Sequence, residues 1–405
     1  IHNDIKIFGW ASTKLYNQNK IYKIKLTLYA LFYSSKIKLI DFNKNKKKKI
    51  LFFYGDYASK SEHHFNMIKF LKLTVSNNFE VSDFKIINRL SFINFFKKLV
   101  LTLNFYFNVK NKDSLSNKLM FSCLAAKGVI EYRYYDSIIK KFLNYNPIVI
   151  NFCDAIGEEN IIAQVSNKSK LKTITLQHGQ YNINKKKTIS ADDESYNNFV
   201  STYMFCWGKE TIKELTRSNI DRKRFFVTGL LKKKLKKKYL LSNKKKNTFG
   251  VVLSGNNQTQ YNLDLINFSN HLSKEYNLNY FIRMHPSNHE IFIRKFTNNK
   301  CLKVLNYKNK ENNKYFRACD FTLIGRSGFY LDCIEFKKKF IFYDNGSLPN
   351  FLKSSKISIN HTKQLIYKLK LFNNNDIYYS LKNKYNDDIN QKYKINNFLM
   401  KLCTV

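Results

Sequence analysis

The sequence predicts an α/β protein with two domains, each built on a parallel sheet, that face a central cleft. Short, mainly apolar runs end at small or polar residues, and helical patterns follow several of them. Runs such as 148–152, 249–253 and 321–324 are typical of strands buried on both faces of a parallel sheet. A length of 405 residues also exceeds what one hydrophobic core ordinarily serves, which indicates about two domains.

The N-terminal part is harder to interpret than the rest. Residues 1–49 mix aromatics with lysines and form an extension, whose final run Lys46–Lys49 is expected to be solvated. The apolar run Ile50–Tyr54 predicts the first clear strand, and Phe84–Ile87 predicts another. Helices are expected next, over 91–107 and 115–145, and the first of them covers the sheet or lines an acceptor groove.

The rest of the first domain alternates strands and helices. Strands are expected at Ile148–Phe152, Thr173–Leu176, Tyr203–Cys206 and Phe225–Thr228, with helices that reach Ser169 and Arg217. Residues 182–198 are polar and too long for an ordinary connection, which favours a functional loop.

The Lys-rich stretch Lys232–Lys246 predicts an inter-domain linker. The predicted division is an N-terminal domain over 1–240, with 1–49 as an extension, a linker over 230–248, a second domain over 249–360, and C-terminal helices over 361–405. Strands of the second domain are expected at Phe249–Leu253, Tyr280–Met284, Leu302–Leu305, Phe321–Ile324 and Phe340–Tyr343.

Composition narrows the class of protein. The formal net charge is +42, but Lys and Asn are enriched in every segment, which favours biased composition over a dedicated nucleic-acid groove. The same basic surface suits an anionic membrane, although no apolar run approaches the ~20 residues of a membrane span. The seven cysteines form no C-x-x-C pair and are expected to be free thiols in a reducing compartment. With no signal peptide recognised, a cytoplasmic protein, peripheral on the inner membrane, is expected.

Two strand ends in the second domain predict a phosphate site. Arg283 and His285 follow one strand and offer N–H donors, and Ser327 and Gly328 stand where a helix is expected to begin. Ser254 and Gly255 follow the first strand of the domain, where glycine permits close backbone approach. The alternatives are that His285 caps a loop and binds no ligand, and that Ser254 and Gly255 form an ordinary strand-to-helix turn.

Polar residues also follow two strands of the first domain. His178 could take a proton from an acceptor hydroxyl, and Asp154 or Glu158 could act as the base instead. The alternatives are a structural histidine and acidic residues that cap a helix N-terminus, which is the role expected of Glu159. No His, Asp or Glu spacing indicates a metal site.

At these positions the chain resembles GT-B glycosyltransferases of the bacterial capsule and lipopolysaccharide type, including polysialyltransferases, Kdo transferases and CDP-glycerol glycerophosphotransferases. The similar segments lie within residues 148–345, and residues 1–147 carry none. They are Leu176–Tyr181, Phe205–Gly208, Val227–Gly229, Arg283–Pro286 and Ser327 through Lys338.

The resemblance implies two Rossmann-like domains, of which the N-terminal one (1–240) binds the acceptor and the second (249–360) binds a nucleotide-activated donor. It also implies no permanently bound cofactor and no metal for the donor phosphates. It implies that His285 and Ser327 hold the phosphates of a nucleotide-activated donor (CMP- or CDP-linked, or UDP-linked), assisted by Arg283. The acceptor would be a surface polysaccharide or a lipid-linked chain. The family's acidic-acidic-Gly base motif is absent, and Gly157-Glu158-Glu159 stands instead. Two alternatives are a nucleotide-sugar 2-epimerase of the same fold and a basic nucleic-acid-binding protein.

Overall fold

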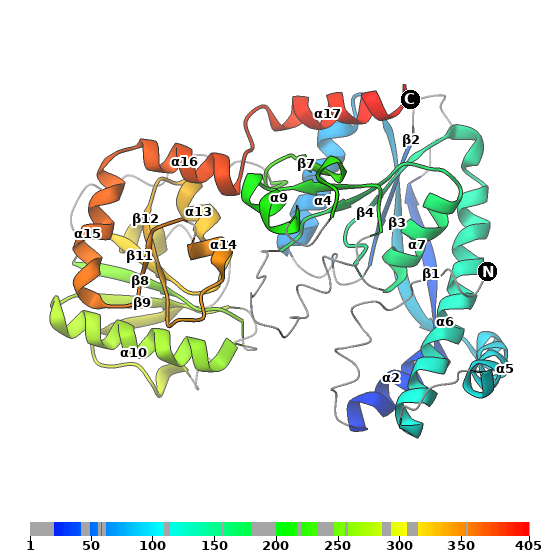
Figure 1. Cartoon of the computed structure of the whole chain (residues 1–405), viewed down its shortest axis with the longest axis horizontal. Coiled ribbons are helices and arrows are strands. Elements are labelled where there is room, and N and C mark those ends of the chain that lie inside the picture. The colour runs from blue at the N-terminus through cyan, green and yellow to red at the C-terminus, as the bar shows by residue number, and fades with distance from the viewer. Residues whose placement is uncertain are drawn as a thin grey trace.

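The computed structural model describes residues 20–41, 49–55, 58, 62–108, 114–155, 157–179, 200–216, 220–232, 247–255, 258–285, 293–305, 315–353 and 355–404. Within them the chain forms two sheets with helices packed against them (Figure 1). The predicted loop at 182–198, and the predicted linker beyond Lys232, lie outside the described residues.

The first sheet has seven strands in the order β1-β3-β2-β4-β5-β6-β7. They are β1 Tyr33–Asp41, β2 Lys49–Tyr54, β3 Glu80–Leu90, β4 Ile148–Asn151, β5 Thr173–Leu176, β6 Tyr203–Cys206 and β7 Phe225–Val227. All neighbours pair in parallel except β1, which runs antiparallel to β3 at the edge. The sequence pattern did not predict β1, because lysines alternate with its apolar residues.

Helices cover both faces of this sheet. They are α2 Lys20–Phe32, α4 Glu62–Val75, α5 Phe92–Asn108, α6 Leu115–Lys140, α7 Gly157–Lys168 and α9 Lys209–Thr216. Alternate residues of β2 divide between the two faces, as a strand's period of two requires. Phe52 packs with Met67 of α4, whereas Phe53 packs with Tyr135 of α6 and Ile161 of α7.

Lys49 corrects the prediction of a solvated run at Lys46–Lys49. It opens β2 and is buried, with its Nζ 3.7 Å from Glu80 Oε1 and 4.0 Å from the centre of the Tyr145 ring. A carboxylate and an aromatic face together compensate the ammonium group for the water that it loses.

The second sheet has six parallel strands in the order β10-β9-β8-β11-β12-β13. They are β8 Thr248–Val252, β9 Asn279–Arg283, β10 Cys301–Leu305, β11 Phe321–Ile324, β12 Lys339–Tyr343 and β13 Ser358–Ile359. Numbered from β8, this is the order 3-2-1-4-5-6 of a dinucleotide-binding sheet. The helices α10 Thr259–Glu275, α13 Tyr330–Glu335, α14 Asn350–Lys353 and α15 Leu365–Lys370 belong to this half.

The last two helices carry the chain back to the first sheet (Figure 1). Helix α16, Asp376–Tyr385, packs on α13 and α9, and helix α17, Gln391–Leu402, packs on α4. Phe398 of α17 stacks on Phe226 of β7 with 4.2 Å between ring centres. Helices over 362–404 were predicted from the sequence, but the packing of α17 on the first half of the chain was not.

The segment between α16 and α17 docks on two glycines. A Cβ at Gly208 would lie 2.6 Å from the carbonyl carbon of Tyr385, and one at Gly229 would lie 2.7 Å from Cα of Asp388. The Asp387 backbone N–H donates to the Trp207 carbonyl oxygen at 2.9 Å. These glycines belong to the Trp-Gly and Thr-Gly pairs that carried the resemblance, and here they admit a neighbouring backbone.

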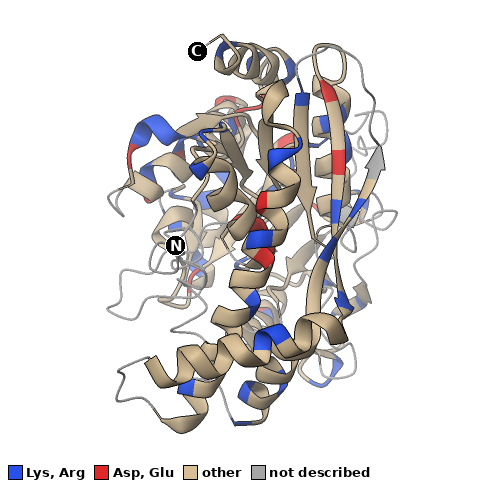
Figure 2. Cartoon of the chain, turned by 90° about the vertical axis from the view of Figure 1, so that its right-hand side faces the viewer, with Lys and Arg blue, Asp and Glu red and all other residues tan. Residues whose placement is uncertain are grey.

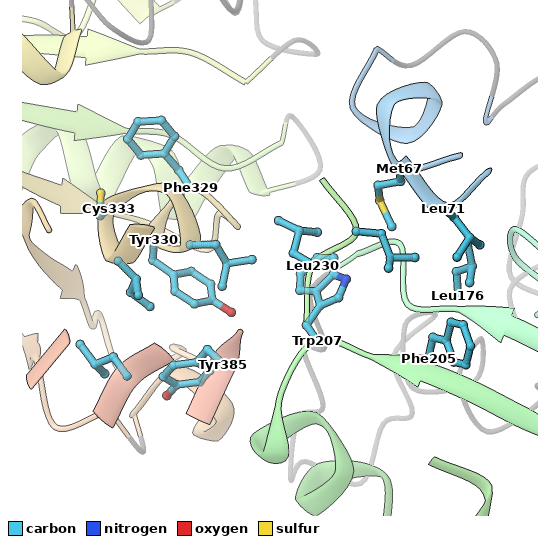
Figure 3. Packing of buried hydrophobic residues seen from close by; sticks show 14 of the residues in the cluster. Met67, Leu71, Leu176, Phe205, Trp207, Leu230, Phe329, Tyr330, Cys333 and Tyr385 are labelled. Carbon is cyan, nitrogen blue, oxygen red and sulfur yellow. The ribbon is translucent and has the colours of Figure 1, made fainter. Parts of the chain in front are cut away.

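Basic residues are spread over many elements, as the composition indicated. Figure 2 shows Lys and Arg on helices, strands and turns across one side of the molecule. Apolar packing, in contrast, connects the two halves. One buried cluster includes Trp207 and Leu230 from the first half together with Tyr330 and Tyr385. Figure 3 shows these four side chains between the two halves.

Candidate functional site

Three predicted segments of the second half meet at one edge of its sheet. Ser254 and Gly255 follow β8, Arg283 ends β9, and Ser327 follows β11, and these three strands are neighbours. The strand order reverses between β8 and β11. Parallel sheets of this kind bind ligands at that reversal, outside the carboxyl ends of the strands.

The turn after β8 is fixed by helix α10. Ser254 N–H donates to Asn262 Oδ1 at 2.8 Å, and Asn262 Nδ2 donates to the Ser254 carbonyl oxygen at 3.0 Å. The Ser254 side chain is 1% exposed, and its hydroxyl has no hydrogen-bond partner among the described residues. A Cβ at Gly325 would lie 3.0 Å from that hydroxyl, so the turns after β8 and β11 are in contact.

Arg283 and His285 take different positions. Arg283 is 6% exposed, and its guanidinium lies 4.3 Å from the centre of the Phe329 ring. His285 is exposed. Partial enclosure and the Arg283 charge lower the pKa of His285 below its ordinary value. The buried Arg283 guanidinium therefore packs against the Phe329 ring, while the His285 side chain lies at the surface. Pro286 lies outside the described residues.

The turn after β11 is partly open to solvent. Ser327 is partly buried, and its Oγ accepts a long hydrogen bond, 3.4 Å, from the Phe329 N–H. Gly328 is exposed, and a Cβ there would meet nothing within 4 Å. Helix α13 begins at Tyr330, two residues after the expected start.

Arg326, in the same turn, is a residue that the sequence analysis did not select. Its Nη1 donates to Gln258 Oε1 at 2.8 Å, its Nη2 donates to the Ser347 carbonyl oxygen, and its guanidinium lies over the Tyr261 ring. Its Nε is buried without a hydrogen-bond partner among the described residues. Its position between Gly325 and Ser327 was the available signal.

In the first half, the carboxylate of Asp154 accepts hydrogen bonds from backbone N–H groups. Asp154 is 1% exposed, and its Oδ2 accepts from the N–H groups of Val200 and Ser201 at 3.1 and 2.6 Å. Burial raises the pKa of Asp154, against the effect of those hydrogen bonds. Asp154 thus fixes the segment that leads into β6.

Glu158 belongs to a buried polar cluster with Lys127, Glu131 and Ser35. Lys127 Nζ contacts Glu131 and lies 3.1 Å from Glu158 Oε1, which also accepts from Ser35 Oγ at 3.1 Å. Burial opposes the ionisation of Glu158, but the Lys127 charge and the hydrogen bonds outweigh it and lower its pKa to about 2. A carboxylate with so low a pKa is a weak proton acceptor.

Glu159 lies where the first sheet reverses its strand order, between β2 and β4. Its Oε1 accepts from the Gly55 N–H at 2.8 Å, and its Oε2 accepts from the Cys153 N–H at 2.5 Å. Burial raises its pKa to about 8 despite these donors. Glu159 therefore joins the loops after two central strands, a wider role than the expected helix cap.

His178 follows β5 at the same edge. Its ring lies 5.6 Å from that of Phe152 and 5.9 Å from that of His64, centre to centre. The side chain is partly exposed, and the loop before it is fixed by Gln177, whose Oε1 accepts from the Trp207 N–H at 2.8 Å. His178 therefore lies, partly exposed, just after β5 at the carboxyl edge of the first sheet.

Candidate metal sites and membrane-spanning helices are both absent from the part of the chain that the structure describes. No group of three or more His, Cys, Asp or Glu side chains is arranged to hold a metal ion there. Among the helices of that part, none is long and apolar enough to cross a membrane. All seven cysteines are free thiols, and four of them are buried.

No protein-family model and no curated protein matches the sequence. Solved structures are similar in fold. The S. aureus MnaA–UDP co-structure has a TM-score of 0.52 at 12% identity, over 88% of this chain and 98% of that chain. A UDP-GlcNAc 2-epimerase from Methanocaldococcus jannaschii has a TM-score of 0.51 at 13% identity, over 88% of this chain and 100% of that chain. The lipopolysaccharide outer core galactosyltransferase WaaB, in apo form, has a TM-score of 0.51 at 12% identity, over 87% of this chain and 99% of that chain.

These similarities confirm the predicted fold class, α/β of the GT-B type with two Rossmann-like halves. At 12–13% sequence identity these similarities are evidence of the fold alone. The similar structures include both a transferase and 2-epimerases.

Proposed function

We propose that this GT-B-fold chain is a glycosyltransferase that moves a sugar, or a polyol phosphate, from a nucleotide-activated donor to a surface polysaccharide or lipid-linked acceptor. The observation that carries the proposal is the contact between the turns after β8 and β11, at the reversal of strand order and beside the end of β9. A nucleotide's phosphates fit such an edge, because glycines there admit close backbone approach and the basic side chains of Arg283 and His285 follow the neighbouring strand.

Each residue of that edge has a proposed role. His285 and Ser327 contact the phosphates, Arg283 adds positive charge through its position behind Phe329, and Gly328 allows the ligand to approach the backbone. Ser254 is buried beside Gly325, so Ser254 and Gly255 contribute the backbone of the turn after β8 to this edge. Charge that develops on the leaving phosphate is thus stabilised by groups already in place.

We assign the base to His178. Asp154 is enclosed and holds the N–H groups of residues 200 and 201, and Glu158 has its pKa lowered by Lys127. An imidazole has an ordinary pKa near neutrality, which suits proton removal from an acceptor hydroxyl. His178→Gln should therefore reduce transfer while leaving nucleotide affinity unchanged.

Thermal melting with CMP, CDP, UDP, GDP and ADP at fixed salt tests the donor site. A nucleotide at a hundredfold excess over its Kd stabilises the native state by about 2.7 kcal/mol. One pyrimidine nucleotide should raise the melting temperature, and His285→Ala should abolish the increase. His271→Ala is the matched control, because His271 is an exposed histidine on α10. Equal shifts with every nucleotide, or none, would contradict a specific donor site.

A nucleotide-sugar 2-epimerase is the second candidate, because UDP-GlcNAc 2-epimerases share the fold with the same TM-score, 0.51, as the galactosyltransferase WaaB. Incubation of the preferred nucleotide sugar without acceptor distinguishes the two. An epimerase converts the sugar to its C2 epimer, whereas a transferase leaves it unchanged until an acceptor is added.

A further inference from the structure

Helix α5 exposes most of its large apolar side chains, and its two buried residues are polar. Lys98 and Thr102 are its buried residues. Lys98 Nζ donates to the Leu31 carbonyl oxygen at 3.3 Å and to that of Tyr33, where α2 passes into β1. A surface helix in water normally does the reverse, with its apolar stripe toward the core. The orientation of α5 indicates that its outer side faces something less polar than water.

The outer side of α5 is a continuous apolar stripe. At 100° per residue, its seven exposed apolar side chains fall within an arc of about 120°. They are 37–79% exposed, and they are Phe92, Ile93, Phe96, Leu99, Val100, Leu103 and Phe107. The stripe runs the length of the helix, roughly 25 Å.

Two neighbouring helices extend this stripe. Helices α2, α5 and α6 pack against one another. Among the exposed apolar residues of the other two are Ile21, Ile24 and Leu28 on α2, with Leu115 and Leu119 at the start of α6. We call these side chains and the α5 stripe together the apolar face. Isolated apolar residues are common on protein surfaces, but so large a group indicates an interaction site.

The charge around the apolar face is of one sign. Segments 20–32, 92–108 and 115–130 contain no acidic residue, while Lys20, Lys25 and Lys97 are exposed. Figure 2 shows basic but no acidic residues on the helices in its lower part, which is this region. A second copy of the same face would bring lysines against lysines. An apolar layer with an anionic surface is the complementary partner.

We propose that the apolar face binds the surface of a bilayer that contains anionic lipids, with its apolar side chains at the boundary between headgroups and acyl chains and its lysines among the headgroups. The proposal rests on residues other than those of the donor edge, so it stands or falls separately. Helix α5 directly follows the carboxyl end of β3, and His178 follows the carboxyl end of β5. Bound in this way, the protein presents His178's edge of the sheet on the side of the bilayer.

Co-sedimentation with vesicles tests the proposal. Vesicles of phosphatidylcholine alone are compared with vesicles of equal parts phosphatidylcholine and phosphatidylglycerol. The variant Ile93→Ser, Phe96→Ser, Val100→Ser should lower partitioning into the anionic vesicles by about tenfold or more. The matched control, Ile366→Ser, Tyr367→Ser, Tyr379→Ser, removes exposed apolar residues from the C-terminal helices and should leave partitioning unchanged.

A very basic protein also binds anionic vesicles through charge alone. Equal partitioning of wild type and the α5 variant would therefore overturn the proposal, as would a dimer in solution that the α5 substitutions dissociate without any vesicle binding. A second measurement places the helix. Tryptophan introduced by Phe96→Trp should be quenched by brominated lipids, and tryptophan introduced by Tyr367→Trp should not.

Discussion

Gly208→Ala tests whether the return of the chain to the first sheet depends on close backbone contact. A Cβ at position 208 would lie 2.6 Å from the carbonyl carbon and 2.8 Å from the Cα of Tyr385. Ordinary contacts begin at 3.4 Å, so that carbon has to retreat by about 0.8 Å. Overpacking of this kind costs about 1–3 kcal/mol. Loss of the hydrogen bond from Asp387 N–H to the Trp207 carbonyl would add about 1 kcal/mol.

The expected destabilisation is thus about 2–4 kcal/mol, which at about 2 °C per kcal/mol lowers the melting temperature by about 4–8 °C. Scanning calorimetry measures it, and limited proteolysis should show earlier cleavage near residues 386–390. Gly328→Ala is the control, since a Cβ there meets nothing within 4 Å. If Gly208→Ala melted within about 1 °C of wild type, the packing argument would be wrong.

Three further predictions concern titratable groups. The folded pKa of Glu159, about 8, exceeds its unfolded value, so its contribution to stability is lost as pH rises toward 8. Urea unfolding should therefore show that the unfolding free energy of wild type falls relative to that of Glu159→Gln between pH 5 and 8, by up to ~1.4 kcal/mol per pH unit. A difference between the two proteins that does not change with pH would refute this reasoning. Lys127→Met leaves the carboxylates of Glu131 and Glu158 without their cation and should cost about 3–5 kcal/mol at pH 7, less at pH 5 where they take up protons. The pKa of His285 is lowered in the free protein, and a bound phosphate would raise it by favouring the charged imidazole. Nucleotide binding measured by titration calorimetry should therefore tighten as pH falls from 7.5 to 6, and His285→Gln should remove the part of that dependence due to the imidazole.

The buried strands could be predicted from the sequence because their apolar runs are continuous. Thr173–Leu176, Tyr203–Cys206 and Phe321–Ile324 have the predicted bounds. The edge strand β1 was missed because edge strands are half-solvated and carry lysines between apolar residues. The return of α17 to α4 was missed as well, since helical periodicity identifies an apolar face but not its distant partner.

The candidate site shows the same division. The sequence placed Ser254, Arg283 and Ser327 at strand ends, and parallel pairing then brings those ends to one edge. The sequence alone does not reveal that the Arg283 guanidinium packs against the Phe329 ring while His285 is exposed, because tertiary packing decides which side chain faces outward. Nor could it separate Glu158 from Glu159, since adjacent helical residues point about 100° apart and meet different partners.

The position of α17 affects how the chain can fold during synthesis. Every strand of the first sheet is made before residue 228, yet Phe226 and Phe205 are covered by Phe398, which is made after both sheets. Asn396 likewise reaches back to the Thr74 carbonyl oxygen at 2.9 Å. The first half therefore emerges from the ribosome with aromatic surface that nothing nearby in sequence covers. Over that interval it is a substrate for chaperones, and a fragment that ends before α17 should be aggregation-prone when expressed alone.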